Sequence, residues 1–293
     1  MLMHVDLTLE WMGPAAGLVS LTAAALVYTT GWRRLRRRLQ GRFGASQLAA
    51  FLAGIASLGI AIASPLDRAA DTLLSAHMVQ HILLLTIAPA LLLLGNPLLP
   101  FLRGLPDSGR RVVGALWRRR SLRRAVHALT HPVIALVVSS LVFWSWHLPG
   151  PYQLALRAPA FHLAEHVSFV AAGFLFWYPV VQPWPSRPRW PRGAIIPYLL
   201  AADVQNTVLA AVLTFSDRVF YPFYQVHGRA TEAATLSDQA LAGVIMWVPV
   251  SLAYLVPAAV LTIRLLSRTT RPHPHAVLQI ERRLYHANDH HLR

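Results

Sequence analysis

Histidines recur in pairs four residues apart, inside stretches of this sequence that are otherwise apolar. His77 and His81 form one pair, and His162 and His166 form another, with Glu165 beside it. Residues four apart share one face of a helix, so each pair can offer two imidazoles to one ligand. Neutral imidazole suits copper, zinc, iron or nickel, whereas magnesium and calcium require more oxygen ligands. The pattern therefore predicts a transition-metal site, with the identity of the metal left open by the spacing.

Further polar residues can complete such a site. His147 is a fifth candidate imidazole ligand, and Asp67, Glu165 and Asp238 are candidate acceptors that hold the rings in one orientation. The chain has no cysteine, which excludes disulfides, thiolate ligands and a cysteine nucleophile. Any metal must be held by histidine, carboxylate or methionine side chains.

The composition indicates that the elements carrying these residues cross a membrane. Of 293 residues, 55% are hydrophobic and only 13% are charged, which is too apolar for a water-soluble domain of this length. A membrane-spanning helix needs about 20 mostly apolar residues. We predict one all-α domain, a polytopic bundle of seven such helices followed by a basic tail at 264–293. The predicted spans are 14–32, 46–64, 72–95, 132–148, 161–182, 194–215 and 239–263.

The arginines predict the orientation of this bundle. The net charge is +15, and every basic residue is arginine. Arginine is concentrated in alternate connections and in the tail, at 33–42, 103–124, 187–192 and 264–293. By the positive-inside rule these segments face the cytoplasm, with the N-terminus outside and the C-terminus inside. We therefore interpret the arginines as residues that set the orientation of the protein in the membrane and attract anionic lipid. We expect no nucleic-acid binding. Asp6 and Glu10 before the first span distinguish it from a secretory signal, so we expect it to stay in the membrane.

This orientation places the candidate ligands at one depth. The spans that contain His77, His147 and His162 all bring these residues to the outer third of the membrane, together with Asp67 and Asp238. Ionisable groups are costly in hydrocarbon and commonly mark functional sites. We expect at least three of the five imidazoles to meet at one ion.

Two other chemistries remain open. His162-Leu163-Ala164-Glu165-His166 matches the H-x-x-E-H motif of some zinc proteases, which favours an intramembrane zinc hydrolase as an alternative. Asp203 and Asn206, near mid-membrane, could relay ions or protons in a metal or proton transporter, or form a hydrogen bond between helices.

The C-terminal segment contains five more histidines. The stretch VLQIERRLYHANDHH can form a basic amphipathic helix on anionic lipid, or the histidines can form a second metal site. These histidines are His273, His275, His286, His290 and His291.

Three blocks of the sequence resemble the seven-helix bacterial CtaG family of cytochrome c oxidase assembly factors. The first block is SPLDRAADTLLSAHMVQHILLLTIAPALLLLGNP, residues 64–97. The second is FWSWHLPGPYQLALRAPAFHLAEHVSFVAAGFLFWYPVV, residues 143–181, and the third is DQALAGVIMWVP, residues 238–249. They follow the order and spacing of the family and cover about a third of the chain.

The resemblance implies a multi-pass protein of the bacterial inner (plasma) membrane. It also implies a role in the maturation of a haem-copper oxidase, at the copper step, and contact with oxidase subunits. It also implies metal-ligand roles for the five histidines that are predicted to lie at one depth, which are His77, His81, His147, His162 and His166. The matching blocks do not include the arginine-rich tail.

Overall fold

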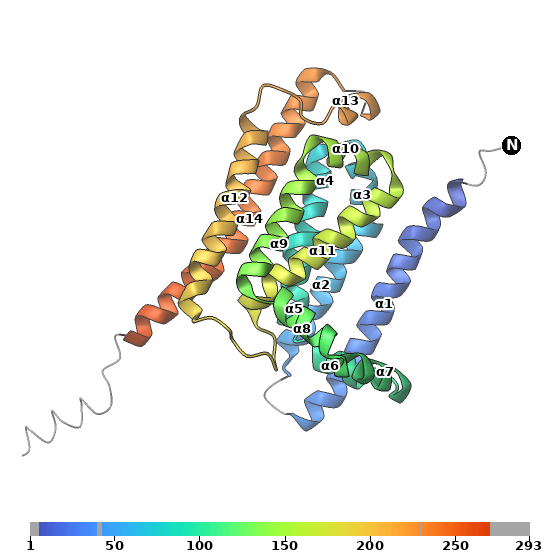
Figure 1. The fold of residues 1–293 in the computed structure, drawn as a ribbon. Coiled ribbons are helices and arrows are strands. Elements are labelled where there is room, and N and C mark those ends of the chain that lie inside the picture. The colour runs from blue at the N-terminus through green and yellow to red at the C-terminus, as the bar shows by residue number, and fades with distance from the viewer. Residues whose placement is uncertain (1–5, 40–42, 229, 270–293) are drawn as a thin grey trace, which may run out of the picture.

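The computed structural model describes residues 6–39, 43–228 and 230–269 (Figure 1). Within these ranges the chain is helical and contains no β-strand. The predicted all-α class is therefore confirmed. The elements in chain order are α1 (Asp6–Arg38), α2 (Ala45–Ala63), α3 (Pro65–Ala70), α4 (Leu74–Ile82), the π-helical turn η1 (Leu83–Ile87), α5 (Ala88–Leu94), α6 (Leu98–Gly104), α7 (Asp107–Arg118), α8 (Arg120–Leu129), α9 (Pro132–His147), α10 (Pro149–Arg157), α11 (Pro159–Val181), the 3-10 turn η2 (Arg192–Ala194), α12 (Ile195–Phe215), α13 (Phe223–His227) and α14 (Glu232–Thr269).

Six helical segments of the described chain are long and apolar enough to cross a membrane, and they correspond to six of the seven predicted spans. The remaining predicted span falls on α9, which has only 16 residues. It passes the same test only together with α8, and the two helices meet at a bend of 75°. The chain is therefore a multi-pass membrane protein with six or seven spans. The six segments are Ala15–Arg37, Ala45–Ala63, Leu74–Leu94, Pro159–Val181, Arg192–Phe215 and Glu232–Ser267.

The span formed by α4, η1 and α5 lies at the centre of the bundle and packs against α2, α11 and α14. Its middle is a π-helical turn, in which the N–H of Ala88 bonds to the carbonyl of Leu83 five residues earlier. Pro89 follows directly and has no N–H to donate, so the regular helical bonding pattern is interrupted here in any case. The π-helical turn begins two residues after His81. It therefore determines the direction in which the helix that carries the first histidine pair continues into α5.

Helix α11 approaches this central span very closely at Gly173. A Cβ atom at this position would overlap the backbone carbonyl of Leu85 and the ring of Pro89. Glycine is therefore required by the close approach of two backbones. This contact holds α11 against η1 and α5, which continue the helix that carries the first histidine pair, so the two pairs are fixed relative to each other.

The arginine-rich connections gather at one end of the bundle, where Figure 1 shows the end of α1 beside α6 and α7. The Arg34 guanidinium donates to the carbonyl of Arg103 at 2.7 Å. Arg189 donates to the carbonyl of His127, which joins the connection before α12 to α8. We call this the arginine-rich end. Which side of the membrane it faces remains a prediction from the arginines.

Candidate metal centre

The first histidine pair lies in the first turns of α4. His77 and His81 are buried, and their ring centroids are 4.3 Å apart. The helix begins at Leu74, where the Asp238 carboxylate accepts hydrogen bonds from the N–H of Leu74 at 2.6 Å and of Ser75 at 3.3 Å. The Ser75 hydroxyl donates to the same carboxylate. Asp238 belongs to α14, so a neighbouring helix caps the one that carries the pair.

The second pair lies on α11 and faces the first. The rings of His162 and His166 are 4.1 Å apart, and His166 lies 6.2 Å from His81 and 6.4 Å from His77. His162 approaches His77 to 5.5 Å. All four distances join ring centroids. The structure therefore brings together the two pairs that the sequence placed at one depth.

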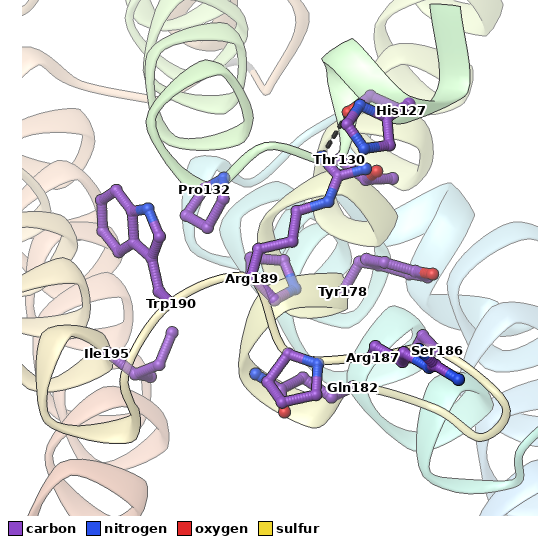
Figure 2. A pocket seen from close by; sticks show the side chains of 12 residues that line it. His127, Thr130, Pro132, Tyr178, Gln182, Ser186, Arg187, Arg189, Trp190 and Ile195 are labelled. Carbon is purple, nitrogen blue, oxygen red and sulfur yellow. Dashed lines mark hydrogen bonds between the residues drawn. The ribbon is translucent and has the colours of Figure 1, made fainter. Parts of the chain in front are cut away.

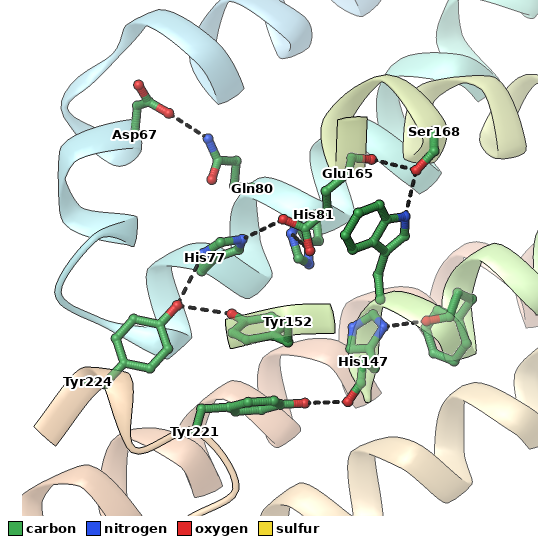
Figure 3. A network of polar contacts seen from close by, with 12 residues as sticks. Asp67, His77, Gln80, His81, His147, Tyr152, Glu165, Ser168, Tyr221 and Tyr224 are labelled. Carbon is green, nitrogen blue, oxygen red and sulfur yellow. Dashed lines mark hydrogen bonds and ion pairs between the residues drawn. The ribbon is translucent and has the colours of Figure 1, made fainter. Parts of the chain in front are cut away.

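Glu165 lies between the pairs and is completely buried. Its Oε1 atom is 3.5 Å from Nε2 of His81, and its Oε2 atom is 3.7 Å from Nε2 of His77 (Figure 3). Each of the four side chains of His77, His81, Glu165 and His166 offers one ligand atom, and these atoms all lie within 4.8 Å of one another. The sequence predicts a supporting role for Glu165, and in the structure its carboxylate lies among the same atoms that could bind an ion.

His147 approaches the same group from the end of α9. Its ring centroid is 5.8 Å from that of His81, and its Nδ1 lies 2.7 Å from the carbonyl of Phe143. A carbonyl only accepts, so Nδ1 carries the proton and Nε2 has the free lone pair. His147 and His162 thus flank the four-residue group, which we call the His/Glu cluster and define as His77, His81, Glu165 and His166.

The polar atoms of the cluster fit a bound cation. Buried polar groups in proteins are nearly always hydrogen-bonded, because an unpaired one is costly. Eight buried nitrogen and oxygen atoms of the cluster and its two flanking histidines have no hydrogen-bond partner. A metal ion held by imidazole and carboxylate would satisfy such lone pairs together. The atoms are Nε2 of His77, both ring nitrogens of His81, Nε2 of His147, His162 and His166, and both Glu165 oxygens.

Three buried tyrosines lie next to the cluster or to its flanking residue His147, and the sequence did not point to them. The Tyr224 hydroxyl bonds to Nδ1 of His77 at 3.1 Å and to the hydroxyl of Tyr152 at 2.9 Å. The Tyr221 hydroxyl donates to the backbone carbonyl of His147 at 2.7 Å. Burial raises the pKa of all three phenols above its ordinary value, so they remain protonated. The aromatic run FYPFY at 220–224, in a connection predicted to lie on the outer side, is the signal that could have identified two of them.

The other two predicted carboxylates act on the helix rather than on a ring. Asp67 accepts a hydrogen bond of 2.8 Å from the side chain of Gln80, which also donates to the carbonyl of Ala61 at 2.7 Å. Asp238 caps α4 as described above. The hydrogen bonds of Asp67 and Asp238 thus position the helix that bears His77 and His81. None of these hydrogen bonds is made to an imidazole ring.

Asp203 and Asn206 lie on α12 and outside the cluster. The Asn206 side chain donates to the carbonyl of Met246 at 3.1 Å, which is a hydrogen bond between α12 and α14. Asn206 also lines a small cavity of about 20 Å³ with Leu85 and Ser139. Of the two roles predicted for this pair, an ion or proton relay and a hydrogen bond between helices, Asn206 makes the hydrogen bond.

A larger cavity of about 340 Å³ lies at the arginine-rich end (Figure 2). It is enclosed by the end of α8, the start of α9, the end of α11 and the connection that precedes α12. Figure 2 shows Arg189 extending toward His127, with Arg187 and Ser186 at another part of the wall. This cavity is separate from the His/Glu cluster. The five histidines of the C-terminal segment lie outside the described residues.

The chain matches the model of a protein family described as cytochrome c oxidase caa3 assembly factor, Caa3_CtaG, over residues 26–268. It is 29% identical over 239 residues to uncharacterized proteins of Mycobacterium bovis and Mycobacterium tuberculosis, which covers 80% of the chain. An uncharacterized protein of Mycobacterium leprae is 25% identical over 236 residues, or 78% of the chain. The matches cover 35 to 36% of these relatives, so the chain spans about a third of their length. No solved structure matches the chain.

Proposed function

The chain belongs to the cytochrome c oxidase caa3 assembly factor family, as its three sequence blocks predicted, and we propose that it holds a metal ion for the oxidase in the His/Glu cluster. One observation carries this proposal. Three imidazoles and one carboxylate, all buried, bring their ligand atoms within 4.8 Å of one another. When bound, the metal is cargo for the maturing oxidase.

The protein's own residues support such a role by orienting the ligands. The N–H at Nδ1 of His147 is used by the Phe143 carbonyl, and Nδ1 of His77 is used by the Tyr224 hydroxyl. Each contact leaves Nε2 available on the side that faces the cluster. Hydrogen bonding of the second ring nitrogen is the usual way in which proteins fix metal-binding histidines.

Copper is the metal that we propose. Imidazole with one carboxylate suits both copper and zinc. A cytochrome c oxidase requires copper, and the family membership connects this chain with its assembly. We further propose that oxidase subunits are the partners that receive the ion.

The position of Glu165 favours a metal ligand over the general base of a zinc hydrolase. Its two oxygens lie 3.5 and 3.7 Å from ring nitrogens of His81 and His77. In an H-x-x-E-H hydrolase the glutamate acts on metal-bound water while the two motif histidines hold the metal. Here the carboxylate sits among the nitrogens that would bind the ion, and it faces the pair on the other helix.

The direct test is the metal content of the full chain, purified without added metal from cells grown with copper and zinc. We expect about one copper ion per chain beyond any ions held elsewhere, for example by histidines after residue 270. His81→Ala and His166→Ala should each remove this ion while the helix content stays unchanged. His227→Ala is the matched control, since His227 is exposed and packs on Phe223 outside the cluster.

Each outcome decides one point. Zinc in place of copper would retain the site and overturn the metal assignment. Equal metal content in the wild type and in both cluster variants would overturn the metal site itself. In cells, the cluster variants should leave oxidase subunits present but poorly metallated, which absorption spectra of the membranes would report.

A further inference from the structure

Two consecutive helices at the arginine-rich end have an apolar face that the protein itself does not cover. None of the residues of α7 and α8 is buried. Val112 and Leu116 of α7 are 59% and 43% exposed, and Leu122 and Leu129 of α8 are 37% and 42% exposed. At 100° per residue these side chains fall on one face of each helix, while the arginines fall on the opposite face.

The direction of α8 matches a position along the membrane surface. It meets α9 at a bend of 75°, and α9 packs against the membrane-spanning helix α11. Helix α8 therefore turns sharply away from the direction of α9 at the end of the bundle. A basic amphipathic helix in this direction buries its apolar face at the boundary between headgroups and acyl chains.

The cavity beside α8 is built for a negative charge. Arg187 and Arg189 line it together with Tyr178 and Trp190. His127 belongs both to this cavity and to a neighbouring hollow that is lined by Arg120, Arg123 and Arg124. The cavity and the exposed arginine face of α8 are thus continuous, and aromatic side chains of the kind found at membrane interfaces border them.

The surrounding charge is almost entirely positive. Residues 98–131 and 183–194 contain eleven arginines and one acidic residue, Asp107. That carboxylate is already paired with Arg110 on the same helix. The arginines that line the cavity therefore have no acidic neighbour in these segments.

We propose that this end of the molecule binds an anionic phospholipid, with its phosphate in the cavity that Arg187 and Arg189 line and its acyl chains against the apolar faces of α7 and α8. Guanidinium groups bind phosphate through paired hydrogen bonds. In a zwitterionic lipid the positive charge of the choline group repels the arginines and weakens this attraction. This proposal is independent of the metal proposed for the His/Glu cluster.

A lipid fits these features better than an acidic protein segment. An acidic segment could pair with the arginines, but it would leave the apolar faces of α7 and α8 in water. An anionic lipid layer meets both requirements with one partner, because its charge and its apolar part lie at adjacent depths.

The test measures lipid retention by the full chain. The protein is purified in a neutral detergent with equal amounts of phosphatidylglycerol and phosphatidylcholine, and native mass spectrometry counts the lipids that remain bound. We expect preferential retention of phosphatidylglycerol. One arginine at an anionic surface contributes about a fivefold gain in affinity, so the double variant Arg187→Gln, Arg189→Gln should weaken retention about 30-fold.

Two variants keep the result interpretable. The control Arg157→Gln, Arg218→Gln has the same change in charge, at exposed positions near α10 and α13, and should retain the lipid as the wild type does. The variant Arg187→Lys, Arg189→Lys keeps the charge and should bind better than the glutamine variant. Circular dichroism verifies the helix content of each protein.

Three results would overturn the proposal. The first is equal retention of the two lipids, or an equal loss in the control variant. The second is thermal stabilisation of the chain by glycerol 1-phosphate to the same extent as by phosphatidylglycerol, which would indicate a site for free phosphate. The third is displacement of the lipid by a polyglutamate peptide at equal concentration, which would indicate an acidic protein partner.

Discussion

The hydroxyl of Tyr224 is the group that fixes the ring of His77. It contacts Nδ1 of His77 on one side and the hydroxyl of Tyr152 on the other. Because burial keeps both phenols protonated, the Tyr224 oxygen can accept a hydrogen bond from the Nδ1–H of His77, and its hydroxyl can donate one to the Tyr152 oxygen. In this arrangement Nε2 of His77 has its lone pair directed at the cluster.

Replacing Tyr224 with phenylalanine should therefore weaken metal binding without removing a ligand. Loss of an outer partner of a ligating histidine typically lowers metal affinity by about 10- to 100-fold. Competition with a chromogenic chelator measures the change. Tyr221→Phe is the control, because the Tyr221 hydroxyl bonds to the backbone carbonyl of His147 and not to a ring. An equal loss of affinity in both variants would show that general packing, rather than ring orientation, is responsible.

At the scale of single residues, the sequence predicted those features that follow from helical spacing. The i, i+4 pairs and the common depth of His77, His147 and His162 required only periodicity and the arginine pattern. The ligand-like position of Glu165 depends on how α11 is rotated toward α4, which spacing within one helix does not specify. The contact between Tyr224 and His77 joins residues 147 apart in the chain, and only the folded packing establishes it.

At the scale of elements, the first turn of α4 depends on a side chain from α14. Asp238→Ala removes the acceptor of the Leu74 and Ser75 N–H groups and leaves the Ser75 hydroxyl without this partner. Loss of such a cap costs about 1 to 2 kcal/mol. We expect the amides of Leu74 and Ser75 to exchange hydrogen faster, as measured by mass spectrometry of peptides from this helix. Asp217→Ala, at an exposed position, should leave this exchange unchanged.

The contact between α11 and the central span should be equally sensitive. A methyl group at Gly173 meets the Leu85 carbonyl and the Pro89 ring, so Gly173→Ala forces the helices apart at a cost of about 1 to 3 kcal/mol. Thermal unfolding in detergent should show a lower midpoint, together with weaker metal binding. Gly150→Ala is the matched control, because an added methyl group there meets nothing within 4 Å. Unfolding of Gly173→Ala at the wild-type midpoint would contradict the close packing.

Helix lengths were predictable because hydrocarbon thickness sets them. Four of the six well-defined spans end within two residues of their predicted bounds, whereas α1 and α14 extend past their predicted spans at both ends. The bend between α8 and α9 was not predicted, because hydropathy reports burial in lipid and not helix direction. Pro89 marks in the sequence where the regular bonding of the central span is interrupted, but the sequence does not specify that the interruption takes the form of a π-helical turn.

At the scale of the whole molecule, orientation remains the prediction on which the depth assignment rests. A fluorescent protein fused after Arg293 should fluoresce, and alkaline phosphatase fused there should be inactive, because the positive-inside rule places this end in the cytoplasm. Alkaline phosphatase inserted near Gly228 should be active, since that connection is predicted to lie outside. The opposite pattern would invert the bundle and place the His/Glu cluster near the cytoplasmic surface.

The burial of the cluster also determines how fast an ion could come and go. His77, His81 and Glu165 have at most 4% of their surface exposed, and the Tyr152 ring and the Tyr224 hydroxyl lie against His77. His162 and His166, on α11, are only half-buried. An ion bound at the cluster would therefore exchange most easily on the α11 side, past His162 and His166. A partner that covers these two residues would slow this exchange without any change in the ligands themselves.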